Sequence, residues 1–421
     1  MATTATSVRD ICAAAKTASR TLATLGSEVK DSALEAIAVA IEERAEEILE
    51  ANAYDVEAGH ADGLSGALID RLTLTQGRME EMARGLRTIA ALPDPVGEVI
   101  DGFRLPNGLD VRKVRVPLGV VAVVYESRPN VTIDAAALCL KSGNAIVLRG
   151  SSSAGRSNAV LAHVAATAAT GAGLPEDALA LLAGGGREEI AELATQNQLV
   201  DLIIPRGGEG LKAGLKGVAT VPVIYAASGN CHVYVDHVAD LDAAEAIILN
   251  AKLQRPGVCN AAETLLVHAD VAESFLPRAL KALSDAGVTL HGDERARAAA
   301  RDVAIDAATK EDWDREYLAL ELAVGVVDSV QDAIEHINAH GSGHSEAIVT
   351  RDTASARAFQ LGVDAACVYV NASTRFTDGG EFGMGAEIGN STQRLHARGP
   401  IGIRELCTFK YLVEGDGHIR A

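Results

Sequence analysis

One cysteine of this chain stands where a thiol could act as a nucleophile. Cys259 lies in the segment QRPGVCNA, residues 254–261, where it follows a Pro-Gly break and precedes a short apolar run. This pattern predicts a thiol at the end of a structural element, where a cleft can form. Four other thiols lie in or beside apolar runs: Cys12, Cys139, Cys231 and Cys367. Because free cysteine there behaves as a small hydrophobic residue, Cys259 is the candidate for covalent chemistry, with an inert thiol as the alternative.

Arginines and histidines supply further candidates for binding. Four arginines lie within motif-like segments: Arg128, Arg255, Arg375 and Arg394. A guanidinium binds carboxylate or phosphate through paired hydrogen bonds, so each is a candidate for the substrate anion, with an ordinary surface arginine as the alternative. Three histidines recur every four residues: His336, His340 and His344. Glycines at 341 and 343 interrupt the helix that would align them, and no metal site is expected.

Residues 1–92 are expected to be helical. Ser32 and Glu35 form an S-x-x-E pattern that is typical of a helix N-terminus, and apolar residues then recur at helical spacing. Further on, Asn107 and Gly108 separate two alternating segments, a strong signal for a β-hairpin. Because a lone two-stranded ribbon is only marginally stable, we expect this hairpin to lean on another element or on a partner subunit.

From residue 119 onward, short apolar runs alternate with helix-length segments. The runs GVVAVVY, AIVLRG and VDLIIP are rich in β-branched residues, which is typical of a parallel sheet covered on both faces. A second alternation of similar weight begins near residue 230, with runs such as HVYVD, AETLLVH and ACVYVN. The sequence therefore predicts an α/β fold with two doubly wound domains, and the tail reads as one more strand.

Length and composition exclude several classes of protein. The 421 residues suffice for two or three domains, and a net charge of −19 without a Lys/Arg-dense block argues against nucleic acid as a partner. No segment approaches the roughly 18 uninterrupted apolar residues of a membrane span, and the N-terminus lacks a secretory pattern, so a cytoplasmic protein is expected. The six cysteines lack CxxC spacing and should be reduced thiols. Neither a P-loop nor a GxSxG motif is present, so a P-loop kinase and a serine hydrolase lack support.

Four segments together resemble the aldehyde dehydrogenase superfamily: LQRPGVCNAAETLLV, VPLGVVAVVYESRPNV, GNAIVLRGS and GGEFGMGAEIG. The resemblance covers nearly the whole chain and is closest to the gamma-glutamyl phosphate reductase branch. It implies two Rossmann-like α/β domains and an oligomerisation ribbon. The expected parts are an NADP-binding domain of residues 1–97 and 117–230, a catalytic domain of residues 231–395, and a ribbon of residues 98–116 and 396–421.

The resemblance assigns catalytic roles to two residues. Cys259 matches the family's nucleophile. Asn130, in the motif SRPN, matches the residue whose side-chain amide completes the oxyanion hole with the backbone N–H of Cys259. Attack on an acyl carbon places charge on oxygen, and preorganised donors there are commonly worth about 3–4 kcal/mol. Without the resemblance, Asn130 would be interpreted as an ordinary turn residue after proline.

Cofactor contacts are implied for the segment that ends a predicted strand at residue 149. Arg149 stands where the family has a lysine that contacts the adenine-side ribose, and Ser151 follows it. Ser152 replaces the glutamate with which many NAD-using relatives bind the ribose 2′-hydroxyl. An arginine without that carboxylate favours NADP, although serines after a strand are also ordinary helix N-caps. The glycine turn at Gly207 and Gly208 is a weaker candidate, because such turns are common in α/β folds.

Two further features concern the catalytic half. Glu316 resembles the glutamate that holds the nicotinamide ribose, although the glycine-proline pair that usually follows is missing. Hydrolytic relatives carry a water-activating glutamate where this chain has AASGNCH, residues 226–232, which contains no carboxylate. An enzyme that exchanges its acyl group with phosphate does not need that base. The absence fits a reductase that acts on an acyl phosphate.

The resemblance thus implies NADPH-dependent reduction of L-glutamyl 5-phosphate to L-glutamate 5-semialdehyde and phosphate in proline biosynthesis, through a thioacyl intermediate at Cys259. It also implies a homo-oligomer, a dimer or tetramer. Glutamate 5-kinase is a candidate transient partner, since a separate chain must make the acyl phosphate. Two alternatives stay open: a phosphate-independent aldehyde oxidiser, and a catalytically silent relative that binds nucleotide as a subunit of an assembly.

Overall fold

The computed structural model describes residues 7–182, 185–225 and 228–420, which fold into two compact units. Unit 1 comprises Met1–Tyr225, Gly383–Gly389 and Ile401–Ala421, and unit 2 comprises Ala226–Phe382 and Asn390–Pro400. The chain therefore enters unit 2 five residues earlier than the sequence suggested, since the predicted boundary was residue 230 and the observed one is 225. The segment 383–389, expected in the catalytic domain, belongs to unit 1.

Helices make up the N-terminal part of unit 1, as predicted. They are α1 (Val8–Leu22), α2 (Ser27–Glu43), α3 (Ala45–Ala61), α4 (Gly66–Leu72) and α5 (Gln76–Ala90). The capping box predicted at Ser32 is wrong, because α2 begins at Ser27 after the N-cap Gly26, and Ser32 lies inside it. Glu35 instead forms an ion pair with Arg87 of α5.

A parallel sheet of strand order β5-β4-β3-β6 forms the core of unit 1. Its elements are β3 (Val120–Tyr125), α6 (Asn130–Lys141), β4 (Ala145–Gly150), a 3-10 turn (Ser152–Ala154), α7 (Gly155–Gly171), β5 (Leu179–Leu181), α8 (Arg187–Ala194), β6 (Leu202–Arg206) and α9 (Glu209–Val218). Both β3 and β4 are buried along their whole length, which explains their uninterrupted apolar sequences. Because β4 and β5 extend the sheet on one side of β3 and β6 on the other, the strand order reverses between β3 and β6.

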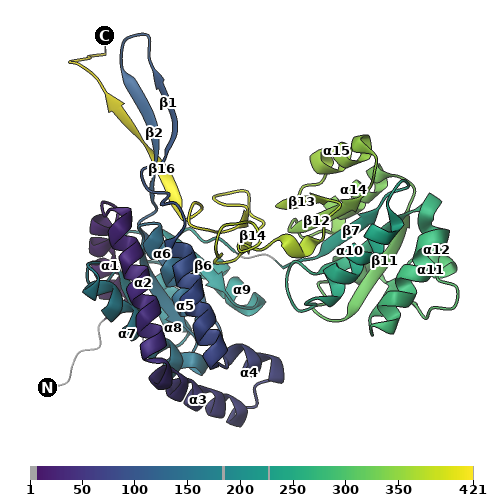
Figure 1. The fold of residues 1–421 in the computed structure, drawn as a ribbon, viewed down its shortest axis with the longest axis horizontal. Helices are drawn as coiled ribbons and strands as arrows, with labels where there is room; N and C mark the ends of the chain where they lie inside the picture. The colour runs from purple at the N-terminus through teal and green to yellow at the C-terminus, as the bar shows by residue number, and fades with distance from the viewer. Residues whose placement is uncertain (1–6, 183–184, 226–227, 421) are drawn as a thin grey trace. The chain divides into compact units, whose positions relative to one another are not determined.

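An antiparallel ribbon extends away from the rest of unit 1 (Figure 1). It consists of β1 (Val99–Arg104), β2 (Asp110–Pro117) and β16 (Cys407–Glu414), with β2 in the middle. The hairpin turns at residues 105–108, where Gly108 has a φ of +97°, a conformation that favours glycine. The predicted hairpin is confirmed, and the element of this chain that supports it is β16.

Unit 2 is built on a second parallel sheet, of order β10-β9-β11-β8-β7-β12-β13. Its elements are β7 (Cys231–Val235), α10 (Leu241–Leu253), β8 (Ala262–His268), α11 (Ala269–Asp285), β9 (Thr289–Gly292), α12 (Glu294–Ala299), β10 (Asp306–Ala307), α13 (Lys310–Asp314), β11 (Glu321–Val327), α14 (Val330–His340), β12 (Ser345–Val349), α15 (Thr353–Gly362), β13 (Cys367–Val370), a 3-10 turn (Thr374–Phe376), β14 (Asn390–Ser391) and β15 (Gly399–Pro400).

Alternate side chains of β7 enter two different cores. Val233 and Val235 pack against α10 and α11, whereas Tyr234 packs against α14 and α15. Both faces of the sheet are therefore covered, and the predicted α/β fold with parallel sheets is confirmed. Within the described ranges, no helix is long and apolar enough to cross a membrane.

Candidate active site

The predicted site residues of unit 1 gather at the carboxyl edge of its sheet. They are Arg128, Asn130, Arg149, Ser151, Ser152, Gly207 and Gly208. Strands β4, β3 and β6 are neighbours, so the loops that follow them meet at one edge. The backbone N–H of Ser127 donates to Ser151 Oγ at 3.0 Å, and that of Gly208 donates to Glu126 Oε2 at 2.8 Å. This edge is also the point where the strand order reverses, which is where open α/β sheets bind ligands.

Asn130 is the first residue of α6 and is half-buried. Its Nδ2 donates to Asp134 Oδ2 at 2.9 Å, one helical turn further on. An amide nitrogen carries two N–H groups, so this contact orients the side chain without using both. Burial raises the pKa of Asp134 to about 6, against the opposing effects of the Asn130 hydrogen bond and the Arg206 charge. Asp134 is a neighbour of Asn130 that the sequence did not point to.

Arg149 is buried near the end of β4, and its guanidinium is engaged within the protein. Its Nε donates to Glu189 Oε1 at 3.1 Å, and its Nη2 donates to the carbonyls of Gly185 and Gly186. The side chain thus ties β4 to the start of α8. Ser152, by contrast, is exposed at the beginning of the turn that follows β4.

The glycine turn after β6 has a structural reason for its composition. A Cβ on Gly207 would overlap the carboxylate of Glu126. The same carboxylate accepts the backbone N–H of Gly208 at the start of α9. Gly207 therefore allows Glu126 to approach the helix N-terminus, where a negative charge is favourable.

Cys259 lies in the loop between α10 and β8, here called the Cys259 loop (residues 254–261), and its side chain is half-buried. The loop sits at the amino edge of the unit 2 sheet. The thiol of Cys231 donates to the carbonyl of Cys259 at 3.2 Å. Gly229 lies against the same carbonyl, and its own N–H donates to Glu316 Oε1 at 2.7 Å. Glu316 is thus connected to the Cys259 loop through Gly229.

Replacing Gly229 by alanine should disturb the Cys259 loop, because a Cβ at that position would overlap the Cys259 carbonyl. Displacement of a reacting group by about 1 Å can cost roughly 100-fold in rate. We expect kcat to fall at least 10-fold, with a near-native circular dichroism spectrum, in steady-state assays of Gly229→Ala. Gly257→Ala in the same loop is the matched control, since its Cβ would meet only the carbonyl of Leu318, at 3.8 Å. Equal activity of the two variants would contradict this.

A buried ion pair holds the two elements that flank the Cys259 loop. Lys252, near the end of α10, lies 2.5 Å from Glu263 of β8, and both side chains are fully buried. Burial raises the pKa of Glu263 to about 7, although the Lys252 charge opposes this. This ion pair therefore fixes the two ends of the loop to each other. Removal of one partner alone would be strongly destabilising, because the other charge would stay buried and unpaired.

Two of the predicted arginines lie at the Cys259 loop. Arg375 Nε donates to Gln254 Oε1 at 2.7 Å. Burial lowers the pKa of Arg375, and the neighbouring charge of Arg255 lowers it further, whereas Asp378 and, less strongly, Cys259 raise it. Arg255 and Cys259 therefore both lie within electrostatic range of Arg375.

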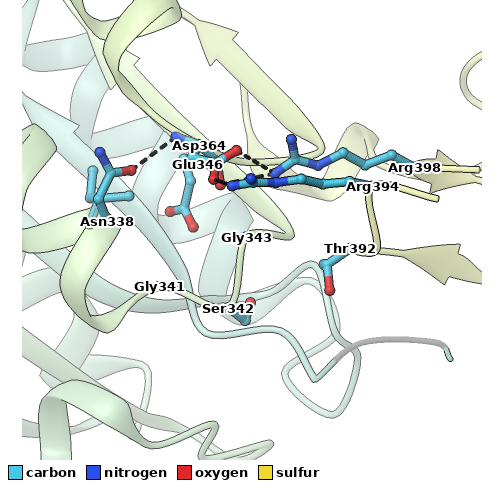
Figure 2. A pocket seen from close by; sticks show the side chains of 10 residues that line it. Asn338, Gly341, Ser342, Gly343, Glu346, Asp364, Thr392, Arg394 and Arg398 are labelled. Atoms are coloured by element: carbon cyan, nitrogen blue, oxygen red, sulfur yellow. Dashed lines mark hydrogen bonds and ion pairs between the residues drawn. The ribbon is translucent and has the colours of Figure 1, made fainter.

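The other two predicted arginines lie elsewhere. Arg128 is half-buried in the loop between β3 and α6 of unit 1. Arg394 forms an ion pair with Asp364 in unit 2, beside Arg398, which binds the same carboxylate at 2.8 Å (Figure 2). Arg394 thus belongs to a cavity at the β12 and β13 end of the sheet.

Two of the three regularly spaced histidines, His336 and His340, lie with their ring centroids 4.7 Å apart, whereas no ring contact joins His344 to them among the described residues. His336 lies edge-on to Trp313 and His232, and His340 pairs with Asp314 at 2.8 Å. His344 is buried after the end of α14 and contacts Ser345 Oγ at 2.8 Å. Among the described residues, no group of three or more His, Cys, Asp or Glu side chains could hold a metal ion.

Comparison with known proteins agrees with this arrangement. Residues 1–300 match the model of the aldehyde dehydrogenase family. The gamma-glutamyl phosphate reductase of Thermobifida fusca is 56% identical over 413 residues, which are 98% of each chain. That of Moorella thermoacetica is 57% identical, over 96% of this chain and 97% of its own. The crystal structure of gamma-glutamyl phosphate reductase from Thermotoga maritima matches with a TM-score of 0.95 and 46% identity, covering 98% of this chain and all of that one.

The chain belongs to the aldehyde dehydrogenase family, in its gamma-glutamyl phosphate reductase branch. The resemblance stated from the motifs is therefore confirmed, and the protein is an oxidoreductase of this family. Aldehyde dehydrogenases use a nicotinamide cofactor, which the carboxyl edge of the unit 1 sheet is suited to bind.

Proposed function

We propose that the protein reduces L-glutamyl 5-phosphate to L-glutamate 5-semialdehyde and phosphate, with NADPH as the reductant, on the route to proline. The observation that carries the proposal is the Cys259 loop, which holds a half-buried thiol beside Arg255 and Arg375. A thiolate there can attack an acyl carbon, and the two guanidinium groups can bind the phosphate that leaves. The named relatives support the same substrate.

The chemistry starts with Cys259. Its thiolate attacks the acyl carbon of the acyl phosphate, the C–O bond to phosphate breaks, and a thioacyl group remains on sulfur. Phosphate is a good leaving group, so this step needs little acid catalysis. The nicotinamide cofactor, when bound, supplies the hydride that reduces the thioacyl carbon. Loss of the C–S bond from the resulting hemithioacetal releases the aldehyde and restores the thiol.

Asn130 is proposed to stabilise the negative oxygen that forms in these steps. Its amide is already oriented by Asp134, so little reorganisation is needed when charge develops, which is the condition under which such donors are most effective. Asp134 is then a positioning residue, because it acts on the reaction only through Asn130.

The pKa of Asp134 gives this arrangement a pH dependence. With that pKa raised to about 6, the carboxylate is ionised above pH 6 and accepts the Asn130 N–H, whereas protonation below pH 6 weakens the acceptor. We expect kcat to decline as the pH falls through about 6, and Asp134→Asn to lose this inflection while keeping its KM. Steady-state profiles between pH 5 and 8 test this. An unchanged inflection in the variant would assign it to another group.

NADP is proposed as the cofactor, held at the carboxyl edge of the unit 1 sheet by the turn that contains Ser151 and Ser152. Residues 150–153 carry no carboxylate that would repel a 2′-phosphate. Arg149 would have to exchange Glu189 for the phosphate, since its Nε now binds that carboxylate. Glu316 is proposed to hold the nicotinamide ribose.

The test of the proposed function is the reverse reaction, because the acyl phosphate is unstable. The purified protein is given L-glutamate 5-semialdehyde with NADP or NAD, with and without phosphate, and reduced cofactor is followed by absorbance. The proposal expects turnover only with phosphate and faster with NADP. Turnover without phosphate would make the protein an ordinary aldehyde oxidiser, and no turnover in any condition would favour a nucleotide-binding subunit.

We also propose that the ribbon joins copies of this chain. Large apolar side chains of the ribbon are exposed: Val99, Ile100, Phe103, Phe409, Tyr411 and Val413. The strands β1 and β16 are its edges, and exposed apolar edge strands pair with other chains unless they are covered. Tyr411→Asp should therefore lower the mass measured by light scattering to that of a smaller species. Tyr54→Asp, on α3 and similarly exposed, is the control and should leave the mass unchanged.

A further inference from the structure

A cavity of about 390 Å³ opens in unit 2 between the loop after α14, the start of β12 and the segment that links β14 to β15 (Figure 2). Polar and charged side chains dominate its lining: Ser342, Glu346, Asp364, Thr392, Arg394 and Arg398. The reaction described above makes no use of these residues. The charged groups are two carboxylates, Glu346 and Asp364, and two guanidinium groups, both of which bind Asp364.

Glu346 is fully buried, yet one of its carboxylate oxygens is unpaired. Oε2 accepts the backbone N–H of His232 at 2.7 Å and lies 2.9 Å from the ring Nδ1. Oε1 has no hydrogen-bond partner among the described residues. This oxygen lies against Gly341 in the lining of the cavity, since a Cβ on Gly341 would be 3.0 Å from it. A buried acceptor without a partner is costly, and a cationic donor in the cavity would remove that cost.

The two arginines provide the opposite charge. Arg394 and Arg398 both bind Asp364, so two positive charges share one carboxylate. The Arg394 side chain is 75% exposed, and Arg398 Nε is buried without a partner among the residues that the structure describes. With Glu346 ionised, the two carboxylates and the two guanidinium groups leave the lining without net charge, which suits a zwitterion.

The cavity lies on the same edge of the unit 2 sheet as the Cys259 loop. Cys259 precedes β8, the cavity lies where β12 begins, and β7 is the strand between them. Two strand spacings amount to about 10 Å. Cys231 at the start of β7 lies between the two strands, because its thiol contacts the Cys259 carbonyl at 3.2 Å and, at 4.0 Å, Nδ1 of His344, which immediately precedes β12.

We propose that this cavity binds the α-amino acid end of the substrate, with the ammonium group on Glu346 and the α-carboxylate on Arg394 and Arg398. The proposal rests on the proposed function. A glutamyl group measures about 5 Å from its amino nitrogen to its acyl carbon. Adding a hydrogen bond of about 2.9 Å at one end and the bond to sulfur at the other gives a length close to the two strand spacings, about 10 Å, between β8 and β12.

The test compares two aldehydes that differ only in the amino group, L-glutamate 5-semialdehyde and 5-oxopentanoate, in the phosphate-dependent reverse assay. Glu346→Gln should raise the KM for the semialdehyde about 100-fold, with kcat nearly unchanged, and leave 5-oxopentanoate within about threefold. Arg394→Gln should raise the KM for both aldehydes about 10-fold, because both carry the carboxylate. Arg295→Gln, which removes an exposed ion pair with Asp328 in the same unit, is the control and should change neither.

Other outcomes overturn the proposal. Equal effects of Glu346→Gln on the two aldehydes would show that Glu346 does not bind the amino group. A free amino acid could also occupy this cavity as an effector. In that case Glu346→Gln would leave both KM values unchanged and abolish inhibition by added L-proline or L-glutamate. If Glu346→Gln lowers the melting temperature sharply, its KM values cannot be interpreted, and the Arg394→Gln variant, whose side chain is exposed, is used instead. An unaltered KM of Arg394→Gln for both aldehydes would then contradict the proposal.

Failure of the proposed function would look different. If the wild type oxidises neither aldehyde with either cofactor, the reductase assignment fails and the cavity is tested by calorimetry with L-glutamate. Binding by the wild type that is lost in Glu346→Gln would retain the cavity as an amino acid site. Equal binding by both proteins, or none by either, would reject it.

Discussion

Replacing Cys259 by alanine is expected to reduce turnover by at least about 10⁴-fold, because removal of a nucleophile eliminates the covalent path rather than weakening one interaction. The substitution deletes one sulfur from a half-buried side chain, so the melting temperature should change little. The measurement is the phosphate-dependent formation of NADPH from L-glutamate 5-semialdehyde, with enough enzyme to detect a residual rate.

The control for this loss of activity is the removal of a buried thiol that cannot reach the substrate. Cys12 is buried on α1, and burial raises its pKa to about 11, so Cys12→Ala should keep the activity. Labelling adds a second readout, since the wild type should lose fast labelling at Cys259 when substrate is bound. Full activity in Cys259→Ala would end the thioacyl mechanism, whatever the labelling pattern shows.

The fold could be predicted because its main signals are local in sequence. Buried parallel strands such as β3 and β4 need uninterrupted apolar residues, and Gly108 marks a turn that requires a positive φ. The capping box failed because S-x-x-E also occurs inside helices, where Glu35 serves an ion pair with Arg87 instead. The unit boundaries differed because the chain passes between units again near residues 383–401, and no composition change marks those points.

Residues of the candidate site could be predicted only where they lie within a recognisable sequence motif. Cys259, Arg255 and Arg375 were identified separately, and the structure places Arg255 and Cys259 within electrostatic range of Arg375. Asp134 follows Asn130 by four residues, so a helix beginning at Asn130 would have indicated their contact. Gly229 and Glu346 carry no such signal, because their importance depends on residues far away in the chain: Gly229 on the Cys259 carbonyl, and Glu346 on an unpaired oxygen that lies against Gly341.

Replacing Asn130 by alanine is expected to lower kcat by about 10²–10³-fold and to change KM little. The reason is that the amide is proposed to bind the oxygen only when it is negatively charged, and loss of one such donor commonly costs this much. A purely structural role of Asn130 would give a different result, because Asn130 is the first residue of α6 and binds Asp134. Loss of that contact alone would lower the melting temperature and leave kcat within a few-fold.

The two roles separate when Asn130→Ala is compared with Asp134→Asn. The second variant replaces the carboxylate acceptor by a weaker amide oxygen and keeps the amide of Asn130. Its loss in kcat should therefore be smaller, because only the orientation of that amide is affected. Asn197→Ala, an exposed asparagine in unit 1, should leave kcat and KM unchanged. If Asn130→Ala and Asp134→Asn instead lose equal activity and equal stability, the amide acts as part of the helix start, and the negative oxygen must be stabilised by other donors.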